Sequence, residues 1–155
     1  MNHLLNDNLP DNAHDISEPQ TTVSETRTEY LLRTGRAKPR FLQGVFPCIG
    51  YGIYESVPLN DALSYVVPQN HVARIQYFRA GNSSEDLIYL TLNIDGKPAR
   101  FFPVGPKSDL HVPLAIIEPH PPGTRIEIAF AAPRGMTGTV IVDVGLTEEA
   151  DKEKV

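Results

Sequence analysis

Residues 65–104 decide the fold class and read YVVPQNHVARIQYFRAGNSSEDLIYLTLNIDGKPARFFPV. From Leu87 to Ile94, every second residue is apolar and the residues between are Tyr, Thr and Asn. A period of two is typical of a strand with one buried face. An earlier alternating run, Ala73 to Tyr77, predicts another strand, and Gly81 to Ser84 predicts the loop between the two. The stretch therefore indicates antiparallel β structure.

The end of this stretch predicts a tight hairpin. Asp95-Gly96 directly follows the second alternating run, and this dipeptide favours a type I′ turn because both positions need positive φ. The returning strand would be Lys97 to Val104. Pro98 and Pro103 cannot donate to a ladder, so we expect this strand at a sheet edge.

Further alternating runs separated by Gly, Pro and Asn predict about seven or eight strands in all. They are residues 51–57, 62–67, 110–116, 126–130 and 140–146. No amphipathic helical period is evident. The sequence thus predicts an all-β fold, an antiparallel two-sheet β-sandwich that is jelly-roll-like or immunoglobulin-like. We expect an extended N-terminal arm with a basic linker in residues 1–45, the sandwich in residues 46–147, and a charged tail in residues 148–155.

Composition narrows the class of protein. The chain has 155 residues, a net charge of −5 and one cysteine, Cys48, which stands among apolar residues and is expected to be a buried, inert thiol. An acidic chain argues against nucleic acid as a partner. No apolar run reaches the roughly 18 residues of a membrane span, and residues 1–15 lack the pattern of a signal peptide. We therefore expect synthesis in the cytoplasm and no membrane partner.

Two N-terminal segments are candidates for binding a partner. Residues 1–26 are polar and cannot bury enough apolar surface to fold alone, which favours an assembly arm that orders on binding; the alternative is a tail that packs along its own domain. The next segment is basic and could dock onto an acidic surface, the alternative being a solvated linker. Its candidate partner-binding residues are Arg27, Arg33, Arg36, Lys38 and Arg40.

No residue pattern in the sequence indicates a catalytic or metal-binding site. The five histidines show no metal-ligand spacing, and no nucleophile or phosphate-binding motif is present. His111, His120 and Glu118 could converge, but the prolines around them favour a surface loop. We expect a protein that is not an enzyme and has no catalytic residues, no metal and no cofactor.

Several segments resemble small β-sandwich accessory and decoration proteins of tailed-phage virions. They are Tyr65-Val66-Val67-Pro68, residues 72–75, Gly81-Asn82-Ser83-Ser84, the run 90–96 that ends in Asp95-Gly96, and the later runs 122–128 and 138–144. The resemblance implies a structural virion protein that decorates or cements a capsid through its arm and loops. It implies the major capsid protein or another virion protein as partner, a homo-oligomer with a trimer favoured, and location in the virion. The alternative is a carbohydrate- or receptor-binding sandwich that uses Tyr54, Tyr77 and Tyr89, although Trp is absent.

Overall fold

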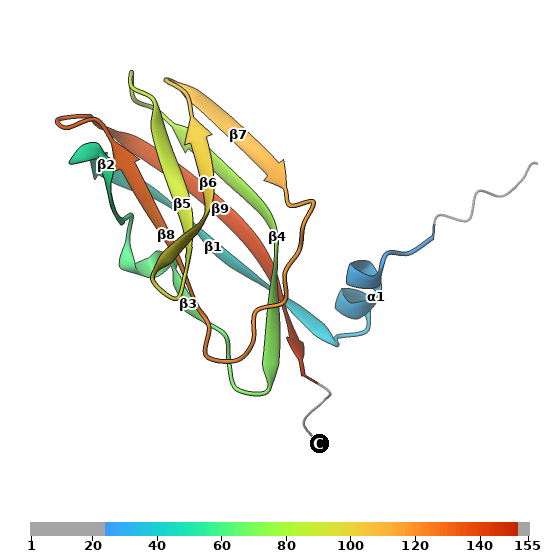
Figure 1. Cartoon of the computed structure of the whole chain (residues 1–155). Coiled ribbons are helices and arrows are strands. Elements are labelled where there is room, and N and C mark those ends of the chain that lie inside the picture. The colour runs from blue at the N-terminus through green and yellow to red at the C-terminus, as the bar shows by residue number, and fades with distance from the viewer. Residues whose placement is uncertain (1–23, 152–155) are drawn as a thin grey trace, which may run out of the picture.

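The computed structural model describes residues 24–151, which form two antiparallel sheets packed face to face (Figure 1). Within these residues lie nine strands, the helix α1 (Arg27–Arg33) and the 3-10 turn η1 (Asp61–Leu63). The strands are β1 (Ala37–Ile49), β2 (Gly52–Pro58), β3 (Ser64–Val66), β4 (His71–Asn82), β5 (Ile88–Ile94), β6 (Lys97–Val104), β7 (Ser108–Pro113), β8 (Arg125–Ala132) and β9 (Thr137–Ala150).

The first and last strands of the domain are neighbours in one sheet. One sheet has four strands in the order β1-β9-β4-β7. The other has the order β2-β8-β5-β6, and β3 pairs with β8 as a fifth strand. In the first sheet β1 runs beside β9 along its whole length, from Ala37 opposite Glu149 to Ile49 opposite Thr137. The predicted all-β, two-sheet sandwich is confirmed.

The core lies between the sheets and follows the period of two. On β5, Ile88, Leu90 and Leu92 point inward, and β9 contributes alternate valines in the same way. The rings of Phe78 on β4 and Phe102 on β6 stack across the sandwich with their centroids 3.9 Å apart. Each fully buried side chain of this size contributes about 1.5 to 3 kcal/mol to stability relative to an exposed one.

The hairpin in the stretch that decided the fold class is as predicted. Asp95 and Gly96 have φ values of 51° and 80°, as a type I′ turn requires. The returning strand β6 lies at the edge of its sheet, where Pro98 and Pro103 remove no needed donor.

The strand before that hairpin lies in the other sheet. β4 belongs to the four-stranded sheet, whereas β5 and β6 belong to the five-stranded one, so residues 83–87 cross between layers. Asn82 holds this crossing. Its buried side-chain amide donates to the carbonyls of Asp86 and Gly105 at 2.8 and 3.0 Å, and its side-chain oxygen accepts from the Ser84 amide.

The predicted domain limits need correction at both ends. β1 begins at Ala37, so the expected arm and linker of residues 1–45 end inside a long strand, because that strand pairs with β9 throughout. β9 continues to Ala150, beyond the expected end at residue 147, since Glu148 and Glu149 are tied by ion pairs. The basic segment also holds an unexpected helix, α1, with a Thr26–Glu29 capping box. Residues 1–23 lie outside the described part of the chain.

Candidate docking face

The outer face of the four-stranded sheet carries a row of exposed apolar side chains. Phe41, Val45 and Ile49 of β1 are 52%, 64% and 56% exposed, and Ile141 of β9 is 53% exposed. Val45 lies directly opposite Ile141 in the register of the two strands. We call these four residues the apolar row.

The sequence of β1 explains why this row exists. Leu42 and Cys48 point into the core and are 6% exposed, so the odd-numbered residues from 41 to 49 point outward. Most outer faces of antiparallel sheets are polar at those positions. β1 instead has apolar side chains on both faces, which is typical of a strand that another surface covers.

The other half of this face, over β4 and β7, is polar. The Tyr77 ring lies against Gly145, where an added Cβ would come within 2.2 Å of it. The Tyr77 hydroxyl donates to Asp143 at 3.1 Å, and Arg79 lies 3.8 Å from the same carboxylate. Burial, and then the hydrogen bond to Asp143 and its charge, raise the pKa of Tyr77. Beside this group lies an open groove of about 420 Å³, which is lined by Gly81 of β4 and by Asp109 and His111 of β7.

The predicted basic segment is largely paired within the chain. Arg27 lies 3.4 Å from Glu149, Arg33 lies 2.8 Å from Glu25, and Arg40 lies 3.2 Å from Glu148. The Arg36 guanidinium lies over the Tyr30 ring at 5.7 Å, and Lys38 is exposed, with no ion pair to any residue between 24 and 151. The structure thus spreads these five residues over α1, the turn that follows it and β1. Their role toward a partner stays a prediction.

Glu148 is the most enclosed of these carboxylates. The Tyr65 hydroxyl donates to it at 2.6 Å and the Arg40 guanidinium at 3.2 Å. Burial alone would raise the pKa of Glu148, but the hydrogen bonds from Tyr65 and Arg40, with the charges of Arg40 and His71, lower it overall. Burial and then the contact with Glu148 raise the pKa of Tyr65 well above its usual value. This group fastens β1 and β3 to the end of β9.

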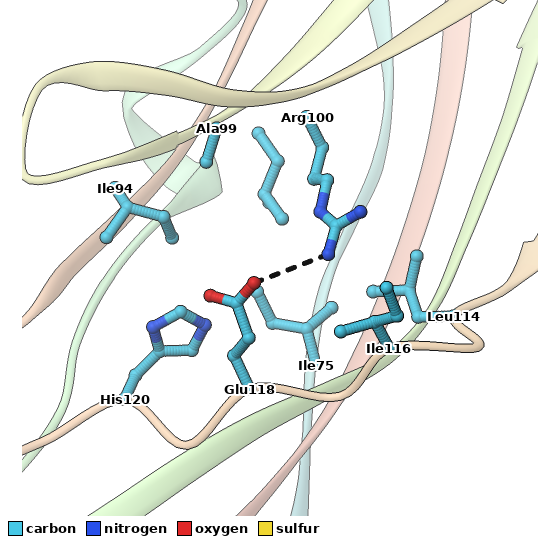
Figure 2. Close-up of a pocket in the computed structure, with 9 residues that line it drawn as sticks. Ile75, Ile94, Ala99, Arg100, Leu114, Ile116, Glu118 and His120 are labelled. Carbon is cyan, nitrogen blue, oxygen red and sulfur yellow. Dashed lines mark hydrogen bonds and ion pairs between the residues drawn. The ribbon is translucent and has the colours of Figure 1, made fainter.

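The mouth of the sandwich holds a small cavity (Figure 2). Glu118 points toward Arg100, and their charged groups lie 3.4 Å apart, while the His120 ring lies beside Glu118. Paired backbone hydrogen bonds between His120 and Ala73 hold this segment against β4. Burial lowers the pKa of His120, against the charges of Glu118 and Asp95. At about 50 Å³, the space suits one or two waters, whereas ligand pockets measure about 300 to 1,000 Å³.

The other predicted site residues do not gather in one place. His111 lies beside Tyr77 on the outer face, away from the pocket that Glu118 and His120 line. Within residues 24–151, no three His, Cys, Asp or Glu side chains are placed to hold a metal ion. Cys48 is buried as expected, and burial raises the pKa of its thiol. Tyr77 lies on one sheet, while Tyr54 and Tyr89 lie on the other.

Sequence reasoning missed the apolar row. The signal was present in residues 41–49, FLQGVFPCI, which are apolar at both odd and even positions. Gly44, with Gly50 and Gly52 just after the segment, indicated bends rather than one long strand. Only the pairing with β9 shows which of its side chains face outward.

Comparisons with known proteins give no family. No family model matches the chain, and no curated protein matches it. Among solved structures, the Gx strain of infectious bursal disease virus matches 77% of this chain and 34% of its own, at 14% identity and a TM-score of 0.46. T=1 particles derived from the same virus match 75% of this chain and 32% of their own, at 12% identity and a TM-score of 0.43. A family 35 carbohydrate binding module from Clostridium thermocellum matches 70% of this chain and 97% of its own, at 14% identity and a TM-score of 0.35.

These likenesses concern the β-sandwich architecture alone. The chain spans about a third of the length of the virus proteins. With TM-scores below 0.5, these matches say nothing about activity or partner. As a separate finding, none of the helices within residues 24–151 is long and apolar enough to cross a bilayer.

Proposed function

We propose that this protein is a non-enzymatic structural component that binds a larger protein assembly through the outer face of its four-stranded sheet. The observation that carries the proposal is the apolar row, four large side chains more than half exposed on two neighbouring strands. Contiguous exposed apolar side chains on a folded domain mark interaction surfaces. A partner that covers them gains about 25 cal/mol for each Å² of apolar surface removed from water.

The shape of the face supports a flat protein partner. The row lies on paired strands that need no rearrangement to bind, and the Tyr77–Asp143–Arg79 group beside it is already hydrogen-bonded. An apolar centre beside a fixed polar margin is the usual arrangement of a protein interface. Such a face can dock as a rigid body.

We further propose that the assembly is a virion, with the major capsid protein or another virion protein as partner, and that the protein decorates or cements the shell as a homo-oligomer. This setting follows from the resemblance of about residues 60–146 to tailed-phage accessory proteins. In this proposal residues 1–26 provide a second anchor on the shell.

Incorporation into particles tests the role of the face. Ile141→Lys should lower the ratio of this chain to the major capsid protein in gradient-purified virions at least roughly tenfold, because it places a charge in the apolar contact. Leu87→Lys is the matched control, since Leu87 is 52% exposed, like Ile141, but is the last residue of the crossing before β5. Normal incorporation of Ile141→Lys, with the fold confirmed by circular dichroism, would contradict the proposal.

Deleting residues 1–26 tests the second anchor. The truncated chain should remain folded and soluble but fail to enter particles. If it enters particles as well as the whole chain does, the arm is not an anchor and the sheet face alone carries the binding.

A pair of aromatic rings favours carbohydrate binding as a second candidate function. Tyr89 and Phe101 lie on the outer face of the five-stranded sheet with their centroids 6.0 Å apart, and Phe101 is 62% exposed. Exposed aromatic faces can stack against the apolar side of a sugar ring. A glycan array should then show selective binding that Tyr89→Ala removes and Tyr54→Ala leaves in place. An array without binding would eliminate this candidate.

A further inference from the structure

The edge strand β1 offers a long unpaired backbone. It has 13 residues and lies at the end of the four-stranded sheet, with β9 on one side only. No strand within residues 24–151 pairs with its other side. An open edge of this length is a template for pairing with another strand, which proteins normally block.

The register shows which backbone groups of β1 face the open side. The Gly50 amide donates to the Met136 carbonyl at 2.7 Å, and this pair continues the register in which Cys48 faces Gly138. Successive residues of an antiparallel strand alternate between bonding one neighbour and facing the other. Counting back from Gly50, the even residues of β1 bond to β9 and the odd residues present their N–H and C=O groups to the open edge.

The two prolines of β1 fit this assignment. Pro39 and Pro47 are both odd, so their missing N–H groups remove nothing from the ladder with β9. They do remove donors from the open edge, on either side of Phe41, Gln43 and Val45. The prolines are equally spaced about Gln43, so the usable part of the edge is symmetric about that residue.

We propose that this edge pairs with the same edge of a second copy, antiparallel and about a two-fold axis at Gln43. Gln43 then faces Gln43 of the second copy, and Phe41 faces Val45 of the second copy on the outer face. The three odd residues of each copy supply the N–H donors of the contact. Pro39 of each copy then faces Pro47 of the other copy. Because proline has no N–H group, the two prolines mark the ends of the hydrogen-bonded segment and interrupt no bond inside it.

The prolines also fix the register. A shift of two residues in either direction would place a proline opposite Phe41 or Val45 and cost a donor inside the paired segment. In the symmetric register, cross-strand contact between Phe41 and Val45 adds an aromatic to β-branched pair on each side of the axis. The self-complementary pattern is what an isologous two-fold contact needs.

The pairing would extend the proposed docking face. The two four-stranded sheets become one continuous sheet, and the apolar rows of both copies meet at the axis on one side of it. This inference deepens the proposed function, since it makes the docking surface a property of a dimer. It also favours a two-fold contact over the trimer that the resemblance implies.

A proline at the axis tests the contact. Gln43→Pro removes the central donor from each copy while leaving the bonds to β9, so sedimentation equilibrium between about 1 μM and about 1 mM should show a dimer dissociation constant raised roughly tenfold or more. Asp109→Pro is the matched control on β7, the opposite edge. The Leu114 amide donates to the Gln76 carbonyl, so the even residues of β7 bond to β4 and odd residues such as Asp109 face the open edge. The Asp109→Pro variant should therefore dimerise normally. A dimer that survives Gln43→Pro, or a wild-type chain that stays monomeric throughout this range, would overturn the proposal.

A cysteine scan tests the register. Cα atoms of directly paired residues lie about 5.5 Å apart, within the reach of a disulfide. Gln43→Cys should therefore link two copies on mild oxidation, whereas Val45→Cys, which faces Phe41 of the second copy, should not. The native Cys48 is buried and points into the core. Linking through Val45→Cys but not Gln43→Cys would reject the two-fold axis at Gln43.

The two proposals fail in different ways. If Gln43→Pro is monomeric yet still enters particles, the dimer is dispensable and the docking face acts alone. If the wild-type dimer forms and Ile141→Lys still enters particles normally, the pairing stands and the docking role of the face is rejected.

Discussion

At the scale of single residues, Gly145 is a position where the fold leaves no room for a side chain. A Cβ at this residue would lie 2.2 Å from the Tyr77 ring, which is held by its hydrogen bond to Asp143. Gly145→Ala should therefore lower the free energy of unfolding by about 1 to 3 kcal/mol, because either the ring or the strand must shift. Urea denaturation followed by circular dichroism measures this change.

Gly81 provides the control for that prediction. It lies on the neighbouring strand β4, and an added Cβ would meet only Ile141, at an ordinary 3.8 Å. Gly81→Ala should leave stability unchanged or slightly raised, since alanine restricts the unfolded chain. Equal losses in both variants would show that strand glycines matter here for a reason other than the Tyr77 contact.

The carboxylate of Glu148 predicts how stability depends on pH. Its pKa in the folded protein is lowered below 4.5, so as the pH falls the unfolded chain takes up this proton first. The stability that Glu148 contributes is complete above its ordinary pKa and is lost as the pH falls through the lowered value. Glu148→Gln should cost about 1 to 3 kcal/mol at pH 7 and flatten the decline in stability below pH 4.5.

Urea denaturation at pH 7, 4.5 and 3 tests this expectation. Glu55→Gln, which changes an exposed carboxyl on β2, should keep both the stability at pH 7 and the steep acid decline of the wild type. A Glu148→Gln variant with the full acid decline would mean that other carboxyl groups produce it.

At the scale of elements, helix α1 should depend on its cap. The Thr26 side chain accepts from the Glu29 amide at 3.2 Å, while the Glu29 side chain accepts from the Thr26 amide at 2.8 Å. Thr26→Ala should reduce the hydrogen-exchange protection of the Glu29 and Tyr30 amides roughly fivefold, since a cap contributes about 1 kcal/mol. The global unfolding free energy should stay the same because no residue of α1 is buried.

Ser24→Ala is the matched control for the cap, as it replaces an exposed hydroxyl outside the capping box. Its exchange pattern should equal that of the wild type. If Thr26→Ala lowered global stability as well, α1 would belong to the cooperative unit of the sandwich.

The elements also show how far the sequence could lead. Alternation in residues 87–94 and the Asp95-Gly96 turn predicted β5, β6 and their hairpin, because those signals are local. The helix α1 was missed since seven residues with a cap give little periodic signal. The placement of β4 and β5 in different sheets depends on Asn82 and on long-range pairing, which no local pattern records.

The same reasoning applies to the candidate site. Arg27 and Arg40 stood out in the sequence as basic residues, but their partners Glu149 and Glu148 lie more than a hundred residues away. Phe41, Val45 and Ile141 could not be grouped before the register between β1 and β9 was known. Local sequence patterns therefore cannot reveal a surface that the first and last strands form together.

At the scale of the whole molecule, the pairing of the first strand with the last decides where the domain begins. β9 bonds to β1 on one side and to β4 on the other, so removing β1 exposes the long inner strand of its sheet. It also removes Leu42 and Cys48 from the core. The expected domain limit at residue 46 would cut this strand, whereas a limit at residue 37 would keep it whole.

Two truncations test this view of the molecule. A chain of residues 37–155 should unfold cooperatively in urea, with a loss of stability limited to the ion pairs of α1 such as Arg27–Glu149, each about 0 to 1 kcal/mol. A chain of residues 46–155 should not fold to a unique state, because it lacks most of the ladder to β9 and leaves that edge open to aggregation. Dispersed amide resonances and a sharp urea transition for the shorter chain would show that β4 alone can hold β9, and that β1 is an added strand whose main purpose is association.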